Sequence, residues 1–252
     1  MMSNISRLGF WTVLLDTLFP MSCLGCGRGL KGYHAVSYCR TCRQDIRFIQ
    51  SPFCSICGKP FGSSGGENHI CGYCLRHHWH FQQARAVVWY RQPVTEAVKI
   101  FKYRGKMHVL ATFTALTNHY LAHEAIAVPD VLIPVPLHVK RLRRRGFNQS
   151  LILCRRLFPA WQGKIEPHVL ERHRWTNPQT GLSGSERRRN VRRAFRVRRP
   201  EKIKNKIILL VDDVFTTGTT VNECARVLRK NKAATVNVFT FARVVNQVDY
   251  VM

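Results

Sequence analysis

Two adjacent carboxylates and a short run of hydroxyl side chains stand together near the end of the 252-residue chain. Asp212 and Asp213 follow an apolar run at residues 207–210, which predicts a buried parallel strand, and residues 221–229 favour a helix. The loop between them supplies Thr216, Thr217, Gly218, Thr219 and Thr220. Amides at a helix start can hold a phosphate, and carboxylates can accept hydrogen bonds from ribose hydroxyls. The pattern therefore predicts a site for a phosphorylated sugar.

A simpler interpretation of this segment is that one acid is an N-cap and the threonines only cap the following helix. The acids alone fit both interpretations. The Thr-Thr-Gly-Thr-Thr loop beside them favours the phosphate site, because its amides, its hydroxyls and the tight turn at Gly218 all suit an anion. The P-loop pattern G-x-x-x-x-G-K-[ST] is absent, which disfavours a nucleoside triphosphatase.

Eight of the ten cysteines form four C-x2-C pairs in the first third of the chain. The pairs are Cys23 and Cys26, Cys39 and Cys42, Cys54 and Cys57, and Cys71 and Cys74. The C-x2-C-G knuckle at residues 23–27 recurs at residues 54–58. Each knuckle can turn two thiolates toward one tetrahedral ion, so two structural zinc sites with four thiolates each are expected, in a double zinc ribbon.

Two alternatives concern these cysteines. Disulfides would require export, but the apolar stretch at residues 5–19 contains Asp16 and lacks a cleavage site, so a docked amphipathic helix is expected there. Sequential pairing of the knuckles gives two ribbons and interleaved pairing gives a cross-brace; the internal repeat fits sequential pairing better. His69, His77, His78 and His80 are expected at the surface. Cys154 and Cys224 are expected as small buried hydrophobes.

The charge of the chain indicates an anionic partner. Forty basic and 14 acidic residues give a formal net charge of +26. Residues 138–199 hold 18 Lys and Arg against 3 Glu and no Asp, a net charge of +15. Such a field favours a nucleic acid first and an anionic membrane surface second. No apolar run reaches 18 residues, so no membrane span is expected.

The middle of the chain predicts the elements that position these residues. Strands are expected at residues 85–90 and 131–136, and helices at 94–103, 109–123 and 147–157. Prolines at the end of the second strand favour a sharp turn, and five basic residues follow it at 140–145. This is where a pyrophosphate would be held, although a solvated basic face is the alternative.

The segment at residues 171–195 contains glycines and a proline and becomes densely basic after Glu186. It predicts a mobile loop that continues into a short helix. Trp161 and Trp175 lie in the same basic region. Aromatic side chains among cations suit single-stranded nucleic acid, but a core position is the commoner one for either tryptophan.

Several motifs occur here in one order and together resemble the ComF/GntX family of phosphoribosyltransferase-like proteins, which is associated with natural competence and the use of external DNA. They are the zinc pairs, the segment 14–20, Val-Pro-Leu at 135–137, Arg-Arg-Gly-Phe-Asn-Gln at 144–149, the spacing of Thr176, Gln179 and Leu182 with Arg187 and Asn190, and the final acid-threonine motif. The resemblance covers nearly the whole chain.

The resemblance implies an α/β fold with a type I phosphoribosyltransferase-like parallel sheet flanked by helices at residues 81–252. Residues 1–80 would form the amphipathic segment and the double zinc ribbon, with a core of their own. It also implies a pocket for phosphoribosyl diphosphate (PRPP) with Mg2+. Asp212 and Asp213 would bind the ribose and residues 216–220 the 5-phosphate. Pro136 and Leu137 would form the pyrophosphate loop. The flap and its surroundings would include Arg145, Asn148, Gln149, Thr176, Gln179, Arg187 and Asn190.

Two functions are compatible with these features. The first is a cytoplasmic, PRPP-binding factor of the external DNA pathway that contacts single-stranded DNA and other competence proteins. Phosphoribosyl transfer to an unknown acceptor stays open for it, because no acceptor-reading motif is visible. The alternative is a nucleobase salvage phosphoribosyltransferase, which needs neither the zinc module nor the charge.

Overall fold

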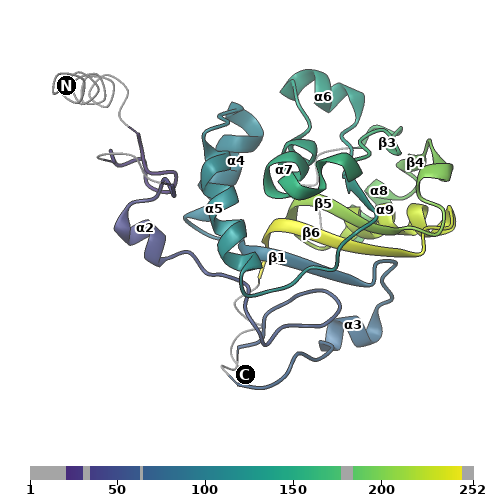
Figure 1. The fold of residues 1–252 in the computed structure, drawn as a ribbon, viewed down its shortest axis with the longest axis horizontal. Helices are drawn as coiled ribbons and strands as arrows, with labels where there is room; N and C mark the ends of the chain where they lie inside the picture. The colour runs from purple at the N-terminus through teal and green to yellow at the C-terminus, as the bar shows by residue number, and fades with distance from the viewer. Residues whose placement is uncertain (1–20, 31–34, 63–64, 177–183, 246–252) are drawn as a thin grey trace, which may run out of the picture.

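A four-stranded parallel sheet forms the centre of the computed structural model, which describes residues 21–30, 35–62, 65–176 and 184–245. The strand order is β1-β6-β5-β2, and every neighbouring pair is parallel (Figure 1). The strands are β1 (Gln83–Trp89), β2 (Val131–Pro134), β5 (Ile207–Phe215) and β6 (Thr235–Arg243). The expected parallel α/β fold is confirmed. The helix expected at residues 5–19 lies outside the described residues.

Helices cover both faces of this sheet. They are α4 (Val94–Arg104), α5 (Val109–Leu121), α7 (Gln149–Leu157) and α9 (Thr219–Lys230). Successive residues of a strand point to opposite faces. Leu209 and Val211 accordingly join the core that contains α4, α5 and α7, whereas Ile208 and Leu210 join the core that contains α9. Burying such a side chain stabilises the fold by about 1.5–3 kcal/mol, which explains why β5 is apolar on both faces.

The predicted elements are present with shifted ends. β5 is longer than the apolar run: it continues through Asp212 and Asp213 to Phe215, because its pairing with β6 extends that far. The helix after it begins at Thr219, two residues earlier than expected. No strand was expected at residues 235–243, yet β6 lies in the middle of the sheet. Asn237 and Thr240 interrupt its apolar run, and both are buried.

Short elements surround the sheet. They are α2 (Arg40–Gln44), α3 (Gly72–Arg76), α6 (Val139–Arg145), η1 (Pro159–Lys164), β3 (Leu170–Arg172), α8 (Gly184–Val191), β4 (Phe195–Val197) and η2 (Pro200–Lys202). β3 and β4 pair antiparallel and form a second sheet that the sequence interpretation did not include. Within the described part of the chain, no helix has the length and apolar content that crossing a membrane requires.

The first part of the cysteine-rich region shares the core of the sheet, whereas Cys54, Cys57, Cys71 and Cys74 form a small buried cluster of their own. Cys23, Leu24, Ile49 and Phe53 belong to the same core cluster as α4 and α5. The backbone N–H of Ile49 also donates to the carbonyl of Val87 in β1, at 2.9 Å. The expectation of separate cores is therefore wrong for the segment from Cys23 to Phe53. A domain boundary near residue 80 stays a prediction.

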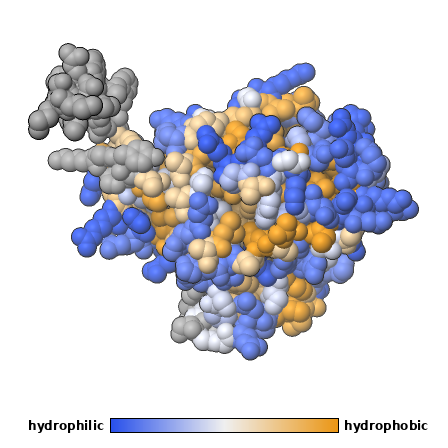
Figure 2. Space-filling view, viewed as in Figure 1, coloured by the Kyte–Doolittle hydropathy of each residue, from blue (hydrophilic) through white to orange (hydrophobic). Residues whose placement is uncertain are grey.

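Hydrophilic residues gather on the side of the molecule where β3, β4 and α8 lie (Figure 1, Figure 2). Exposed arginines of this region are Arg174, Arg189, Arg192, Arg193, Arg196, Arg198 and Arg199. Glu171 forms ion pairs with Arg196 and Arg198, at 2.7 and 2.6 Å. One carboxylate between two arginines leaves this face strongly positive, as the local composition predicts.

Candidate functional site

A cleft of about 1370 Å³ opens at the carboxyl ends of β2 and β5. Ligands of open α/β sheets commonly bind at this edge, because the loops that follow the strands meet there. Eleven residues singled out from the sequence for PRPP binding line the cleft. They are Pro136, Leu137, Arg145, Gln149, Asp212, Asp213, Thr216, Thr217, Gly218, Thr219 and Thr220. Residues separated by as much as 84 positions thus surround one cavity.

The loop between β5 and α9 has the geometry of an anion site. Gly218 has a φ of +72°, a conformation that side chains rarely adopt, and it is the N-cap of α9. A Cβ at this position would lie 2.5 Å from Cζ of Phe215, so the space also excludes a larger residue. The hydroxyls of Thr217 and Thr219 lie 2.7 Å apart. Amides at the start of a 12-residue helix, with hydroxyls beside them, suit a phosphate group.

The acid pair is held by three different elements. Oδ1 of Asp213 forms an ion pair with Nζ of Lys102 from α4, at 2.9 Å. Oδ1 of Asp212 accepts hydrogen bonds from the Ser150 hydroxyl of α7, at 3.0 Å, and from the Asp213 backbone N–H, at 2.9 Å. Oδ2 of Asp213 is buried and has no partner among the described residues. A carboxylate oxygen that is buried without a partner is suited to a ligand hydroxyl or a cation.

Asp212 and Asp213 differ in their electrostatic surroundings. Burial, and then the neighbouring Asp213 carboxylate, raise the pKa of Asp212 to about 7. Burial opposes the charged form of Lys102, but the Asp213 carboxylate outweighs it and raises the pKa of the ammonium group. Lys102 and Asp213 therefore form a buried ion pair, and Asp212 is the member that exchanges a proton near neutral pH.

Three arginines from α6 and β3 also line the cleft. Arg141 and Arg145 come from α6, whereas Arg172 is the last residue of β3. Burial, and then the charge of Arg172, lower the pKa of Arg141 to about 10, so it keeps its charge at neutral pH. Arg143 and Arg144, in the same basic run, are exposed and do not line the cleft. Three guanidinium groups and two carboxylates in one cleft suit a diphosphate that is bound together with a divalent cation.

Of the other residues that were predicted around the pocket, those whose side chains the structure describes do not line it and form hydrogen bonds nearby. Asn148 does not line the cleft; its side chain caps α7 at the N–H of Ser150 and donates to the Val135 carbonyl, at 3.2 Å. Thr176 lies behind the wall, where its hydroxyl accepts from Arg172 and its carbonyl accepts from Arg141, at 2.9 Å. The carbonyl of Asn190 accepts from Arg174, also at 2.9 Å. Gln179 lies outside the described residues, as does the side chain of Arg187.

The two tryptophans of the basic region differ. Trp161 stacks on Phe158, with ring centroids 5.2 Å apart, and packs against the core, as expected for a core residue. Trp175 is 39% exposed. Its ring lies 5.3 Å from the Arg141 guanidinium and 5.8 Å from the Lys140 ammonium. The core interpretation is therefore wrong for Trp175, which offers an aromatic surface between cations at the rim of the site.

The eight paired cysteines form two tetracysteine clusters with sequential pairing. In each cluster the four Sγ atoms lie within 4.8 Å of one another. The first ribbon holds Cys23, Cys26, Cys39 and Cys42, and the second ribbon holds Cys54, Cys57, Cys71 and Cys74. All ten cysteines are free, and Cys154 and Cys224 are buried as expected.

The sulfur geometry fits zinc. The Sγ atoms of Cys26 and Cys39 are 3.8 Å apart, and those of Cys57 and Cys71 are 3.9 Å apart. A tetrahedral ion with Zn–S bonds of about 2.3 Å requires sulfur separations of about 3.8 Å. Backbone N–H groups of Cys39 and Cys71 each approach a sulfur at 3.3 Å, which would stabilise the thiolates. Two structural zinc sites therefore fit the chain, as the four knuckles predict.

Several cleft residues were not identified from the sequence. Lys102 and Ser150 hold the acids, and Trp79, Tyr73 and Arg243 form the wall on the side of the second ribbon. Only Ser150 directly follows a motif, the Asn-Gln pair at residues 148 and 149. Tyr73 lies inside the last C-x2-C pair and Trp79 five residues after it, whereas Lys102 and Arg243 lie far from any motif along the chain and reach the cleft only through the fold.

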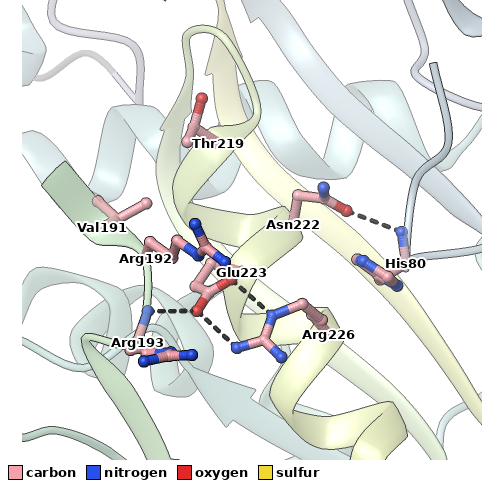
Figure 3. A pocket seen from close by; sticks show the side chains of 8 residues that line it. All are labelled: His80, Val191, Arg192, Arg193, Thr219, Asn222, Glu223 and Arg226. Carbon is pink, nitrogen blue, oxygen red and sulfur yellow. Dashed lines mark hydrogen bonds and ion pairs between the residues drawn. The ribbon is translucent and has the colours of Figure 1, made fainter. Parts of the chain in front are cut away.

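A second, smaller pocket adjoins the cleft and shares Thr219 with it. Glu223 lies at its centre, where its carboxylate accepts from the Arg193 backbone N–H, at 2.7 Å, and from Nε and Nη2 of Arg226, at 2.8 Å each (Figure 3). Asn222 accepts from the N–H of His80, at 2.7 Å. Arg192 and Arg193 complete the lining, so this pocket continues the basic face toward the phosphate loop.

Comparison with known families gives the same two parts. Residues 14–75 match a double zinc ribbon domain, and residues 164–247 match a phosphoribosyl transferase domain. The DNA utilization protein YhgH of Escherichia coli O157:H7 is 31% identical over 220 residues, which cover 81% of this chain and 96% of the relative.

Two competence proteins are also similar. Competence protein F of Haemophilus influenzae is 29% identical over 233 residues, covering 89% of this chain and 98% of the relative. Competence protein ComFC of Bacillus subtilis is 28% identical over 215 residues, covering 81% and 83%. The chain belongs to the ComF/YhgH family of competence and DNA-utilization proteins, with an N-terminal double zinc ribbon and a phosphoribosyltransferase domain.

Proposed function

We propose that this protein binds PRPP with Mg2+ in the large cleft and contacts single-stranded DNA along its basic face, as a cytoplasmic factor in the use of external DNA. One observation carries the PRPP assignment: the acid pair, the threonine loop and the arginines of α6 all line a single cavity. Each of these groups suits a different part of PRPP. Their convergence supports one ligand better than three separate structural roles.

Different residues of the cleft would bind different parts of PRPP. Amides and hydroxyls of residues 216–220 would hold the 5-phosphate, and the Asp212 and Asp213 carboxylates would accept hydrogen bonds from the ribose hydroxyls. Arg141 and Arg145 would face the diphosphate. Mg2+, when bound, would neutralise the diphosphate beside the partnerless Oδ2 of Asp213. Transfer to an acceptor would need a nucleophile in the remaining space, and its identity stays open.

Removing the charge of the acid pair tests the pocket. Asp212→Asn combined with Asp213→Asn should weaken PRPP binding by about 2–4 kcal/mol, because each exchange removes a charged acceptor worth roughly 1.5–3 kcal/mol. Isothermal titration calorimetry measures this directly. Glu201→Gln is the matched control, since Glu201 is an exposed acid outside the cleft. Equal affinity in the double variant and the parent would contradict the site.

DNA binding is proposed on the net charge, the exposed Trp175 and the relatives that carry DNA utilization in their names. Each phosphate neutralised on a single strand changes the slope of log affinity against log salt by about −0.7, so five contacts give about −3.5. Arg192→Ala combined with Arg193→Ala should flatten that slope by about 1.4. Arg40→Ala with Arg43→Ala, on α2, removes two exposed charges elsewhere and should leave the slope unchanged.

Fluorescence anisotropy with a labelled oligonucleotide over a salt series measures both slopes. Trp175→Ala should reduce the preference for single strands over duplex, since stacking of a base contributes about 1–3 kcal/mol. If the parent does not bind single-stranded DNA even at low salt, the DNA proposal fails. A nucleobase salvage phosphoribosyltransferase would then be the better account, and contacts with other competence proteins would lose their basis.

A further inference from the structure

The second ribbon contacts the phosphate loop through Trp79. Nε1 of this indole donates to Sγ of Cys74, at 3.2 Å, so one edge of the ring is fixed by a metal ligand. The other end of the ring reaches the loop: a Cβ at Gly218 would lie 3.0 Å from Trp79 Cη2. The ring also stacks on Phe81, with centroids 4.9 Å apart. A single rigid side chain therefore spans from a zinc ligand to the glycine at the start of α9.

Arg243 makes a second connection. It is the last residue of β6 and is 8% exposed. Its Nη1 donates to the carbonyl of Cys57, at 2.6 Å, and Nη2 lies 3.6 Å from the Sγ of Cys57. The guanidinium carbon lies 4.4 Å from the ring centroid of Phe215, the residue that precedes the threonine loop. Arg243 thus holds a zinc ligand on one side and the support of the phosphate loop on the other.

The charge of the second ribbon explains why Arg243 can be buried. Within the described residues no carboxylate forms an ion pair with Arg243. A buried guanidinium without a counter-ion is strongly unfavourable. One Zn2+ with four thiolates is a dianion, and this dianion would lie directly beside Arg243. A zinc-loaded cluster would therefore supply the negative charge that the buried arginine lacks.

The first ribbon, in the residues that the structure describes, has no such connection to the phosphate loop. The backbone N–H of Cys39 donates to Sγ of Cys23, at 3.3 Å, and the four cysteines of this ribbon lie outside the lining of the cleft. Cys57 and Cys71 of the second ribbon do line it. Both clusters use four cysteines from two C-x2-C pairs, but among the described residues only the second one reaches the phosphate loop.

We infer that the metal of the second ribbon holds the phosphate loop in its binding geometry, with Trp79 and Arg243 as the positioning residues. The inference rests on the proposed PRPP binding at this loop. Loss of the metal would free Cys57 and Cys74, release both positioning side chains and loosen Phe215 beneath the loop. Because linkage is reciprocal, PRPP bound at the loop must stabilise the metal of the second ribbon by the same factor.

Metal retention with and without PRPP tests this. The zinc-loaded full chain is titrated with a chromogenic chelator, in the presence and absence of saturating Mg2+ and PRPP. Cysteine alkylation followed by peptide mass spectrometry identifies the ribbon that has lost its ion. PRPP should raise the apparent zinc affinity of the second ribbon by about 5–150-fold, the usual range for coupled sites, and leave the first ribbon unchanged.

The variant Trp79→Phe tests whether Trp79 positions the phosphate loop or only contacts the ligand. It keeps an aromatic ring at this position but removes both the N–H that bonds Cys74 and the indole atom nearest Gly218, so it should lower PRPP affinity and abolish the protection of zinc by PRPP. A residue that only touches the ligand would lower PRPP affinity and leave that protection intact. Trp161→Phe makes the same exchange in the core, away from the cleft, and should change neither quantity.

The outcomes distinguish this inference from the proposed function. If calorimetry shows PRPP binding but the ligand protects neither ribbon, or both equally, the coupling inference is overturned and the pocket assignment stands. If PRPP does not bind to the zinc-loaded protein at all, both are overturned. Protection confined to Cys54, Cys57, Cys71 and Cys74, and lost in Trp79→Phe, supports the inference.

Discussion

The two zinc ribbons repeat the same C-x2-C pairs and differ in what they contact. In the first ribbon, Cys23 and Leu24 join the hydrophobic core on the face of the sheet that carries α4 and α5. In the second, all four cysteines are buried, and two of them line the cleft that also contains the acid pair. The comparison teaches that one motif, used twice, can stabilise a fold in one place and form the wall of a binding site in another.

Of the changes considered, zinc removal should destabilise both ribbons the most. Structural zinc contributes roughly 10–16 kcal/mol of apparent binding free energy in small zinc fingers, far more than any single side chain. We expect elemental analysis to give close to two zinc ions per chain. Chelation should lower the melting temperature of the whole protein, because the first ribbon shares the main core. A zinc content near zero with oxidised cysteines would contradict both sites.

Substituting the glycine of each knuckle should give the next largest effect, a difference in stability between the two variants. Gly27 and Gly58 occupy equivalent positions with φ of +75° and +69°. A Cβ at Gly27 meets nothing within 4 Å, but one at Gly58 would lie 2.4 Å from the carbonyl oxygen of Ala84 in β1. Gly27→Ala should cost about 1–2 kcal/mol, the strain of a left-handed residue. Gly58→Ala should cost clearly more, because β1 cannot move away.

Urea denaturation of the zinc-loaded protein measures the two free energies of unfolding. The difference between the variants reports how firmly the second ribbon is docked on the sheet. Equal losses in both variants would mean that the contact between Gly58 and β1 is not formed in solution, and the structural contrast between the ribbons would then be lost.

A smaller effect should appear in the pH dependence of PRPP binding. Asp212 has a pKa raised to about 7, so in the free protein it binds a proton as the pH falls through 7. PRPP with Mg2+ favours the ionised carboxylate, and this proton must leave before the ligand binds. Affinity should therefore rise with pH and level off above 7, being about tenfold lower at pH 6 than on the plateau.

Calorimetry across this pH range tests the assignment. Because the ligand phosphates also titrate in this range, Asp212→Asn is the control, and the part of the pH dependence that disappears in it belongs to the side chain. A pH profile identical in the two proteins would show that Asp212 is already ionised below pH 7 or takes no part in binding.

The sequence predicted the local features well. The cysteine knuckles and the segment from Asp212 to Thr220 each carry their information within a few residues, so spacing alone identifies them. β5 was predicted because its apolar run is uninterrupted, although its end was placed too early. The position of Arg141 and Arg145 on one side of α6 follows from helical spacing, but which side faces the cleft does not.

The connections between distant segments were not predictable. Lys102 pairs with Asp213, and Arg243 bonds Cys57 across 186 positions of the chain. No local periodicity encodes such contacts; they exist because β6 lies in the middle of the sheet, beside both β1 and β5. β6 carries buried Asn237 and Thr240, so its pattern did not identify it, and the contact of its last residue with the second ribbon could not be foreseen.

The most direct test of the account is a calorimetric titration of PRPP with Mg2+ into the zinc-loaded protein and two glycine variants. Gly218→Ala places a Cβ 2.5 Å from Phe215 at the phosphate loop, whereas Gly27→Ala, with a nearly equal φ, changes an open position in the first ribbon. The account predicts one PRPP per chain, binding that is lost in Gly218→Ala, and parent-like affinity in Gly27→Ala. No binding to the parent protein, or the same affinity in all three proteins, would contradict it.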